Sequence, residues 1–236
     1  AEYLIQAVNA AFPTVQLSLN DIESSWAGVR PLIHEEGKSA SELSRKDEIF
    51  ISDTELISIA GGKLTGYRKM AERVVDLVKE KHFDEKELKN CETEHLKLSV
   101  SPFISVAEVQ QYEREVYGRI EKHGFPKAKA NYLVETFGKE ANTILSHFEL
   151  MISGDPELSL LLAELDFCLK EEMVISLSDF FVRRAGLLYF NIALVLKYKG
   201  DVASWMQRVL AWPDNQVQEE LKKLDALISD ALYFKN

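Results

Sequence analysis

The sequence has 236 residues, of which 46% are hydrophobic and 28% charged. These values are close to the globular average, so a buried core is expected and disorder along the whole chain is excluded. The formal net charge of −10 argues against nucleic acid or an anionic membrane as a bulk partner. A small anionic substrate remains compatible, because a few local arginines outweigh a diffuse negative field.

The two cysteines, Cys91 and Cys168, are too few for a disulfide scaffold, and no cysteine or histidine cluster predicts a metal site. A reducing cytoplasm is therefore expected. No signal peptide opens the chain, and no apolar run reaches the ~18 residues of a membrane span. The chain begins at Ala1 inside a predicted helix and without an initiator methionine, which favours a fragment of a longer protein.

The first 65 residues mix helical and extended periodicities. Apolar residues recur at helical spacing from Tyr3 until Pro13 ends the run. A polar surface loop is expected at residues 34–44. Extended segments are predicted at residues 15–19, 22–33, 48–52 and 56–60.

From Thr65 onward the pattern is helical. A first helix is predicted to run to about Lys81, with an apolar face of Tyr67, Met70, Ala71, Val74, Val75 and Val78. The charged stretch after it is expected to be a solvated linker at residues 83–94. The predicted fold is an α+β fragment followed by an all-α domain. It is mostly helical, with a few short strands in the first 60 residues and a C-terminal helical bundle at residues 95–236.

Several helix starts in the second half carry capping signals. Ser105 and Glu108 have the spacing of a capping box. Asp155 and Pro156 predict a cap followed by proline at the first helical position. A final helix is expected to begin at Asp214, with an apolar stripe of Val217, Leu221, Leu224 and Ile228.

The stretch ISIAGGKLTGYRKMAER, residues 57–73, carries the strongest sign of a ligand site. A predicted strand enters Gly61 and Gly62, and an amphipathic helix follows Lys63 and Thr65. Glycines let a ligand approach the backbone, and amides at a helix N-terminus favour negative charge. The stretch is not a Walker A loop, because Leu64 stands where a hydroxyl residue would follow the lysine. A plain strand-to-helix turn explains the glycines equally well.

Two arginines are candidate anion ligands. Arg30 lies in SSWAGVRPLIHEEG, residues 24–37, where a following proline fixes the chain, and its fork suits a carboxylate or phosphate. Taken alone, an ion pair with Glu23 or Glu35 is the commoner role for it. Arg45 enters a strand in SELSRKDEIF and by itself reads as part of a charged turn. His34 is a candidate acid or base, although a single loop histidine is more often solvated.

In this order, WAGVRPL, SELSRKDEIF and ISIAGGKLTGYRKMAE resemble the C-terminal third of the FAD-dependent glycerol-3-phosphate dehydrogenases and the related α-glycerophosphate oxidases. The likeness continues in the helical part at LDFCLKEEMVISLSDFFVRRAGLLYF, residues 165–190, so it covers nearly the whole chain. It implies that residues 1–82 are the incomplete C-terminal part of an FAD- and substrate-binding region. Residues 95–236 would then be the family's C-terminal helical domain, after the linker at 83–94.

The resemblance implies that the full-length protein oxidises sn-glycerol 3-phosphate to dihydroxyacetone phosphate by hydride transfer to FAD, a step of glycerol metabolism. Arg30 and Arg45 would bind the substrate, with Arg45 at the phosphate. The cofactor-binding residues would be Gly61, Gly62, Lys63, Leu64 and Thr65, with Lys63 beside the isoalloxazine. Gly66 stands where many relatives have a hydroxyl residue, which puts in doubt a side-chain contact at that position alone. No catalytic residue is assigned within this chain.

The resemblance leaves the electron acceptor open between a quinone and oxygen. Dehydrogenases of this family attach peripherally at the inner face of the cell membrane, whereas the oxidases are soluble. The acidic charge and the lack of a basic amphipathic helix favour the soluble form. A homodimer that covers exposed core surface is a further expectation.

The helical domain is expected to buttress the catalytic part and to carry no chemistry. Its charged residues read as pairs that fasten helices: Glu171, Glu172, Asp179, Arg183 and Arg184. The apolar run from Gly186 to Leu196 is broken by Asn191 and reads as a core helix. The expected core residues of this region are Phe180, Phe181, Leu187, Leu188 and Phe190.

No GxGxxG motif follows a strand in this sequence, so the adenosine and pyrophosphate of FAD have no expected site. The isolated chain is therefore expected to bind no FAD and to be inactive. Two alternatives belong to other functional classes. One is a helical interaction or regulatory module with residues 1–65 as a docking arm. The other is a free-standing phosphate-ligand binding protein that uses Arg30 and Lys63.

Overall fold

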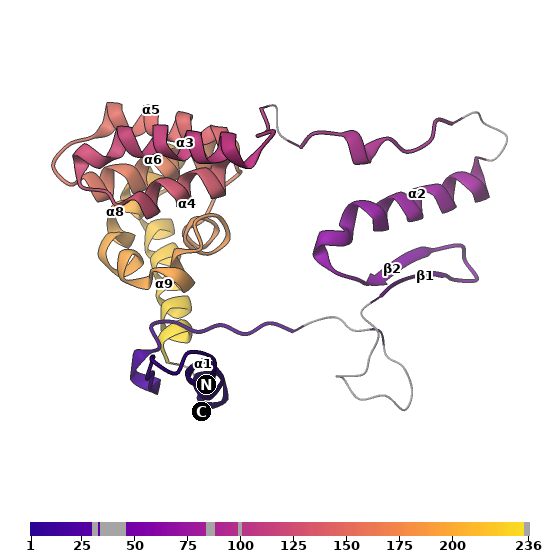
Figure 1. The fold of residues 1–236 in the computed structure, drawn as a ribbon, viewed down its shortest axis with the longest axis horizontal. Coiled ribbons are helices and arrows are strands. Elements are labelled where there is room, and N and C mark those ends of the chain that lie inside the picture. The colour runs from indigo at the N-terminus through magenta and orange to yellow at the C-terminus, as the bar shows by residue number, and fades with distance from the viewer. Residues whose placement is uncertain (30–32, 34–45, 84–87, 99–100, 234–236) are drawn as a thin grey trace. The chain divides into compact units, whose positions relative to one another are not determined.

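The computed structural model describes residues 1–29, 33, 46–83, 88–98 and 101–233 (Figure 1). The chain divides into two compact units. Ala1–Ala27 and Ser101–Asn236 form the helical unit, and Gly28–Val100 form the hairpin unit. Residues 1–27 thus belong to the helical unit, although they were predicted to be part of a first domain of residues 1–82. The domain boundaries of the whole protein stay a prediction.

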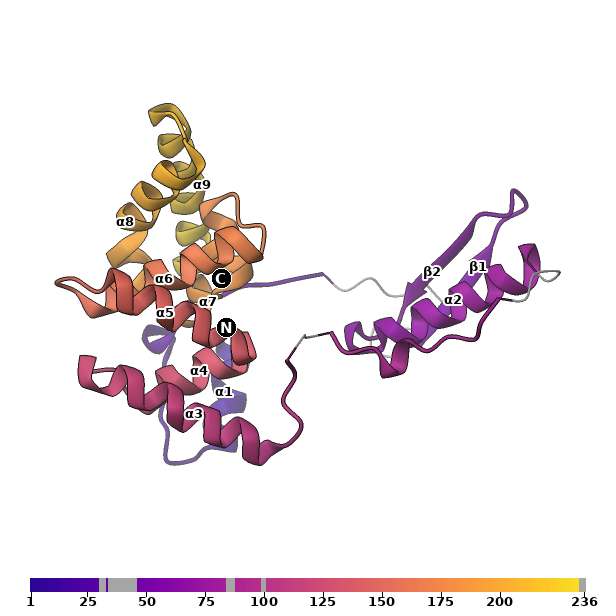
Figure 2. The ribbon, with the colours of Figure 1, turned by 90° about the horizontal axis from the view of Figure 1, so that it is seen from above.

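The helical unit is built from consecutive helices that pack in pairs (Figures 1 and 2). Contacts join α3 to α4, α5 to α6, and α8 to α9. Its core is apolar and aromatic, and Phe148, Phe180 and Phe181 are completely buried. The predicted C-terminal helical bundle is confirmed. The bounds of its elements are α1 Glu2–Ala11, α3 Val106–Ile120, α4 Lys127–Phe137, α5 Ala141–Met151, α6 Pro156–Glu171, a π-helix Asp179–Arg184, α7 Leu187–Phe190, α8 Ile192–Leu210 and α9 Asp214–Leu232.

The predicted helix starts are confirmed. The Ser105 hydroxyl accepts a hydrogen bond from the amide of Glu108 at 3.2 Å, and the Glu108 carboxylate accepts one from the amide of Ile104 at 2.8 Å. The second bond therefore reaches one residue further back than in the usual capping box. The Asp155 side chain caps α6, which begins with Pro156. The last helix, α9, begins at Asp214 as predicted, and Leu224 and Ile228 of its apolar stripe are buried.

Asn191, which breaks the apolar run from Gly186 to Leu196, also divides the predicted core helix into α7 and α8. The backbone of Asn191 leaves the helical region, with φ at −159°, and its side chain accepts a hydrogen bond from the amide of Leu194 at 3.3 Å. Asn191 therefore ends α7 and caps α8. The prediction of Phe190 as a core residue is wrong, since its side chain is 76% exposed at the end of the four-residue helix α7.

Residues 15–19 and the described residues 22–29 do not form the strands that were predicted. The side chain of Asn9 makes the two backbone hydrogen bonds with Leu17 that a neighbouring strand would otherwise make. Its amide donates to the Leu17 carbonyl and its oxygen accepts from the Leu17 amide, both at 2.9 Å. The amide of Ser25 instead donates to the carbonyl of Ala231 at 3.0 Å. In both places a contact with a helix satisfies the backbone and removes the need for a sheet.

The hairpin unit contains strands β1, Asp47–Ile51, and β2, Ile57–Gly61, followed by helix α2, Tyr67–His82. The strands are antiparallel, with Ile49 opposite Ile59. The half-buried apolar side chains of α2 are Met70, Val74, Leu77 and Val78, whereas Tyr67 and Val75 of the predicted face are exposed. No described residue of this unit is fully buried. A two-stranded hairpin with one helix therefore has little core of its own.

The turn from β2 to α2 requires glycine for reasons within the chain. Gly61 and Gly62 have φ values of 75° and 77°, which L-residues with side chains rarely adopt. A Cβ atom on Gly61 would lie 2.5 Å from the carbonyl oxygen of Lys46. A Cβ atom on Gly62 would lie 2.9 Å from the sulfur of Met70. The two glycines let the strand, the preceding chain and the helix approach one another closely.

Arg183 and Arg184 have different roles, although both lie in the π-helix. The guanidinium of Arg184 donates two hydrogen bonds, of 3.1 and 2.7 Å, to the carbonyl of Glu172 at the C-terminal end of α6. It thus satisfies a carbonyl that the helix leaves without a partner. Arg183 pairs with Asp179 at 2.8 Å, one turn away, and its side chain is 59% exposed.

We therefore expect Arg184→Ala to destabilise the helical unit by about 1.5–3 kcal/mol, the usual contribution of hydrogen bonds from a charged group. Arg183→Ala is the matched control and should cost less than about 1 kcal/mol, because exposed ion pairs contribute little. Thermal unfolding followed by circular dichroism measures both. Equal losses for the two variants would contradict the assignment.

Alanine at the glycine pair should loosen the hairpin unit. Gly61→Ala and Gly62→Ala should each lower the stability of the hairpin unit by about 1–2 kcal/mol, because alanine is strained in left-handed backbone. Gly61→Ala should be the worse of the two, because a carbonyl oxygen cannot move aside as the Met70 side chain can. Hydrogen exchange of the β1–β2 amides reports the loss directly.

Gly118→Ala is the control for this pair. Gly118 lies inside α3 with no atom within 4 Å of an added Cβ. The same substitution should therefore stabilise the chain there, by about 0.5–1 kcal/mol. Slower exchange of the hairpin amides in Gly61→Ala would refute the packing account.

Candidate functional site

The predicted flavin-binding residues lie together in the turn that joins β2 to α2. Gly61 and Gly62 are partly covered, whereas Lys63, Leu64 and Thr65 are exposed. Leu64 is 89% exposed. The predicted substrate residues Arg30 and Arg45, and the candidate His34, lie outside the described residues.

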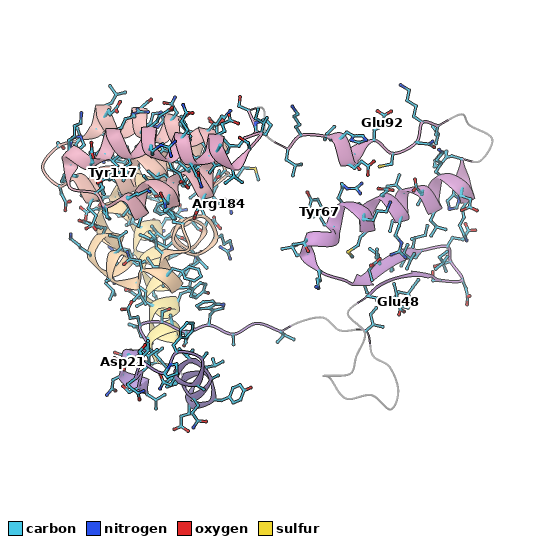
Figure 3. The ribbon with its side chains drawn as sticks, viewed as in Figure 1. Asp21, Glu48, Tyr67, Glu92, Tyr117 and Arg184 are labelled. Carbon is cyan, nitrogen blue, oxygen red and sulfur yellow. The ribbon has the colours of Figure 1, made fainter. Side chains whose placement is uncertain are left out.

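The chain after the glycine pair forms a single 3₁₀ turn, Leu64–Gly66, that leads into α2. The amide of Gly66 donates to the carbonyl of Lys63 at 2.8 Å and closes this turn. Figure 3 labels Tyr67, the first residue of α2, directly after this 3₁₀ turn. The amides at the beginning of α2 therefore point toward the exposed residues 63–65, where the helix carries its positive partial charge.

Charged side chains of both signs lie around this turn, since Asp47 of β1 approaches Gly62 and Glu72 of α2 pairs with basic residues. The first turn of α2 contains no acid, although acids are the residues that stabilise a helix start. It contains Arg68 and Lys69, which both bind the carboxylate of Glu72, Arg68 at 2.6 Å. Hydrogen bonds from Lys69 and Arg68 lower the pKa of Glu72. Among the described residues no acid pairs with Lys63, so its ammonium is available to an anionic or electron-rich ligand.

The glycine pair has two possible explanations, a ligand site and a plain strand-to-helix turn. Both glycines are required by contacts within the chain, with Lys46 and Met70, so they are no separate sign of a ligand. What suits a ligand is the combination of an exposed Lys63, the exposed backbone at 64–65 and the helix start behind them. This arrangement can stabilise negative charge on a group placed against it, and it offers no nucleophile or proton donor other than Lys63 and Thr65.

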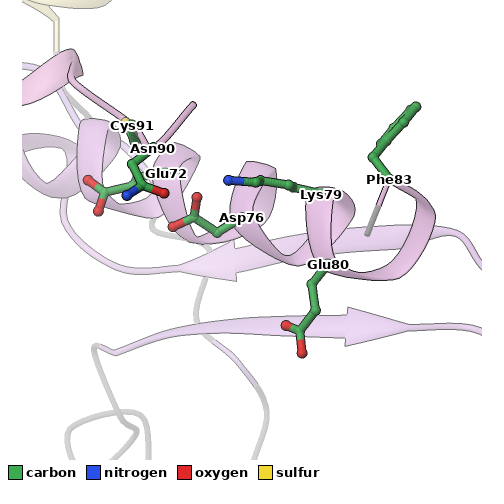
Figure 4. A pocket seen from close by; sticks show the side chains of 7 residues that line it. All are labelled: Glu72, Asp76, Lys79, Glu80, Phe83, Asn90 and Cys91. Carbon is green, nitrogen blue, oxygen red and sulfur yellow. The ribbon is translucent and has the colours of Figure 1, made fainter. Parts of the chain in front are cut away.

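A separate pocket of about 420 Å³ lies on α2 and is not the predicted site (Figure 4). Three carboxylates face one lysine in its lining, which would repel a phosphate ester. The ammonium of Lys79 is also occupied, because it donates to the carbonyl of Leu88 at 2.8 Å. The lining consists of Glu72, Asp76, Lys79, Glu80, Phe83, Asn90 and Cys91.

Ionisable side chains buried in the helical unit bind one another. Glu164 is completely buried and accepts a hydrogen bond of 2.5 Å from the hydroxyl of Tyr132. Burial and the Glu164 charge raise the pKa of Tyr132, and burial raises the pKa of the Cys168 thiol. A thiol held protonated is a poor nucleophile. Throughout the described part of the chain, no group of histidine, cysteine and acidic residues is arranged to hold a metal ion.

One further contact, of residues 24–26 with helices α7 and α9, has no signal in the sequence. Ser24 and Ser25 donate hydrogen bonds to Leu188 and Ala231, residues 164 and 206 positions away. No local pattern could reveal partners at such separations.

In the described ranges, no helix combines the length and the hydropathy that a membrane crossing requires.

Comparisons with known proteins agree with the resemblance seen in the sequence. Residues 52–217 match the family model for the C-terminal domain of alpha-glycerophosphate oxidase. The aerobic glycerol-3-phosphate dehydrogenase of Bacillus subtilis is 38% identical over an alignment of 236 residues, gaps included, and the match covers 98% of this chain and 42% of that protein. The corresponding protein of Staphylococcus epidermidis is 37% identical over 233 residues, with the same coverage.

A solved structure extends this similarity to three dimensions. The glycerol-3-phosphate dehydrogenase from Bacillus halodurans complexed with FAD superimposes with a TM-score of 0.76 and 35% identity. The match covers 100% of this chain and 46% of that one. The chain thus spans less than half the length of the relatives it matches. By the family model and these relatives, the chain belongs to the family of the C-terminal domain of α-glycerophosphate oxidase.

Proposed function

We propose that this chain is the C-terminal part of a flavoenzyme that oxidises sn-glycerol 3-phosphate to dihydroxyacetone phosphate. One observation supports this above the others. The whole chain superimposes on a glycerol-3-phosphate dehydrogenase complexed with FAD, at 35% identity. The predicted flavin-binding turn lies within the region of 52–217 that matches the family model. The full-length protein, not the isolated chain, is the proposed enzyme.

The chemistry of the reaction requires a hydride acceptor, which FAD would supply when bound, since none of the side chains assigned to the site accepts a hydride. We assign Gly61, Gly62, Lys63, Leu64 and Thr65 to the contact with the isoalloxazine. The described residues fit this role, because residues 63–65 are exposed and the positive start of α2 lies behind them. With the cofactor bound, charge from the Lys63 ammonium and the helix amides would stabilise negative charge on a group placed against them.

We assign the substrate's binding to Arg30 and Arg45. Glycerol 3-phosphate carries its charge on the phosphate, and a guanidinium binds two of its oxygens at once. Arg45 is the proposed phosphate ligand, and Arg30 lines the pocket over the flavin. Two arginines hold the substrate's carbon chain in one orientation, so that C2 is presented for hydride loss.

The electrons leave the reduced enzyme for a quinone or for oxygen. Initial rates of the full-length enzyme with a soluble quinone analogue, and with oxygen alone, decide between the two. We place the enzyme in the cytoplasm, with peripheral contact to the inner face of the membrane if the acceptor is a quinone. Sedimentation of the full-length enzyme tests the expected homodimer.

Replacing the substrate arginine should weaken turnover strongly. In the full-length enzyme, Arg30→Ala should lower kcat/KM by about 2–4 kcal/mol, which is roughly 30- to 1000-fold, because a charge-assisted contact is lost. Steady-state kinetics measures the effect, and Arg183→Ala in the helical unit is the control that should leave kcat/KM unchanged. Wild-type kinetics in Arg30→Ala would remove Arg30 from the site.

The isolated chain should bind no flavin. It contains no GxGxxG motif to hold the pyrophosphate of FAD, and residues 61–65 contact one part of the cofactor only. The purified chain mixed with FAD and then desalted should show no visible flavin absorption, whereas the full-length enzyme treated in the same way retains it. A retained flavin band in the isolated chain would contradict this expectation.

A further inference from the structure

Helix α1 presents apolar side chains that no described part of the chain buries. Leu4 and Val8, one turn apart on this helix, are 65% and 39% exposed. No residue of α1 is buried, and neither is any residue between it and Trp26. A helix of 10 residues is only marginally stable in water by itself and is held by the packing of its apolar face. In the described part of the chain, the apolar face of α1 therefore lacks the surface against which it would pack.

Hydrogen bonds and one ring contact hold α1 and the chain that follows it. The side chain of Asn9 donates to the carbonyl of Leu17 and accepts from its amide, both at 2.9 Å. Further along, the amide of Ser25 donates to a carbonyl of α9 at 3.0 Å, and the Trp26 ring lies 4.8 Å from an aromatic ring of α7. These contacts fix the two walls of a groove, with α1 on one side and residues 17–26 on the other.

The groove between these walls has a volume of about 380 Å³. None of the described residues that line it has a charged side chain. An anion such as glycerol 3-phosphate would find no ligand there, whereas apolar side chains would leave water on entering it. We call the groove formed by its six apolar side chains the α1 groove: Leu4, Ile5, Val8, Leu17, Ile22 and Trp26.

The longer protein to which the proposed function assigns this chain supplies an occupant. The chain spans less than half the length of its relatives, and the family model that it matches describes a C-terminal domain. That match begins at residue 52, so α1 lies ahead of the domain and next to the part of the relatives that this chain does not span. Ala1 itself lines the groove. A segment joined to Ala1 therefore has a high effective concentration at the α1 groove.

We propose that the α1 groove is the docking site for an apolar segment of the full-length protein that precedes Ala1. The inference rests on the proposed function, in that the chain is taken as the C-terminal part of a longer protein. The docked segment covers Leu4 and Val8 and gives the apolar face of α1 its packing partner. Because Ser25 and Trp26 contact α9 and α7, the same segment is thereby fixed to the helical unit.

Cysteine labelling of the full-length protein tests the docking. Leu4→Cys should react with a maleimide at least about tenfold more slowly in the full-length protein than in the isolated chain, because the docked segment excludes the reagent. Peptide mapping by mass spectrometry assigns the label to this position. Equal rates in the two proteins would overturn the proposal.

Gln6→Cys is the matched control, because Gln6 is an exposed residue of the same helix that does not line the groove. Its labelling rate should differ less than about threefold between the full-length protein and the isolated chain. Protection of Gln6→Cys equal to that of Leu4→Cys would mean that the whole helix is covered without regard to the groove, and would refute the assignment.

The dependence on concentration distinguishes a second copy of the chain as the occupant. Protection by a segment of the same chain does not depend on protein concentration, whereas protection by a second copy increases with it. Slow labelling of Leu4→Cys in the full-length protein should therefore persist on dilution. Protection that disappears on dilution would overturn the proposal in favour of a dimer.

A charge in the groove should destabilise the full-length protein alone. Leu4→Asp should lower its melting temperature by about 4 °C or more, because the docked segment would bury an unpaired carboxylate. In the isolated chain the same change should shift the melting temperature by less than about 1 °C, since Leu4 is largely exposed and an acid is favourable in a first helical turn. Equal shifts in the two proteins would contradict the docking.

A milder variant keeps this test valid if Leu4→Asp prevents the full-length protein from folding. Leu4→Ala should lower the melting temperature of the full-length protein by about 2 °C or more and leave that of the isolated chain unchanged. Gln6→Ala is its control and should leave both melting temperatures unchanged. No shift for Leu4→Ala in the full-length protein would overturn the proposal.

Turnover separates the failure of this inference from that of the proposed function. Oxidation of glycerol 3-phosphate by the wild-type full-length protein tests the function, whereas labelling and melting test the groove. A protein that protects Leu4→Cys without oxidising glycerol 3-phosphate would support the docking and contradict the function. An active protein in which Leu4→Cys reacts as fast as in the isolated chain would leave the function intact and overturn the docking.

Discussion

The structure depends on the burial of apolar side chains, and this burial is confined to the helical unit. Every fully buried residue in the described ranges lies between Val116 and Ala231. The hairpin of β1 and β2 with α2 is held by one half-buried face and an ion pair between Arg73 and Asp47. Local stability must therefore decrease from the helical unit to the hairpin unit. Segments without a core take their order from contacts such as those of Ser24 and Trp26 with α7 and of Ser25 with α9.

The proposed flavin-binding turn lies in the less stable of the two units. Its glycines adopt left-handed backbone, and the helix that follows starts with Arg68 and Lys69 in place of acids. Glycine adopts this backbone without strain, whereas the basic helix start opposes local stability, and such a conflict is common where a sequence serves a ligand. The exposed Leu64 and Val75 add apolar surface that the described part of the chain leaves uncovered. In the proposed enzyme, the remainder of the protein and the cofactor would cover it.

Features set by neighbouring residues could be predicted from the sequence, and those set by distant residues could not. The caps at Asp155 and Ser105 and the hairpin that ends at Gly61 follow from local periodicity and turn chemistry. Residues 15–19 looked extended, but the Asn9 side chain replaces the missing strand. Phe190 was predicted to lie in the core because it belongs to a continuous apolar run. Its side chain is exposed, since α7 ends there and does not continue into α8. The turn at 61–65 of the candidate site was found, since glycine, lysine and helix start are adjacent in sequence.

The contact between Ser25 and Ala231 also bears on how the protein is made. It joins residues 206 positions apart, one near the beginning of the chain and one in its last helix. On a ribosome that adds about 5–20 residues per second, Ser25 is complete roughly 10–40 s before its partner exists. A chain halted before α9 would therefore lack the carbonyl to which the amide and the hydroxyl of Ser25 donate.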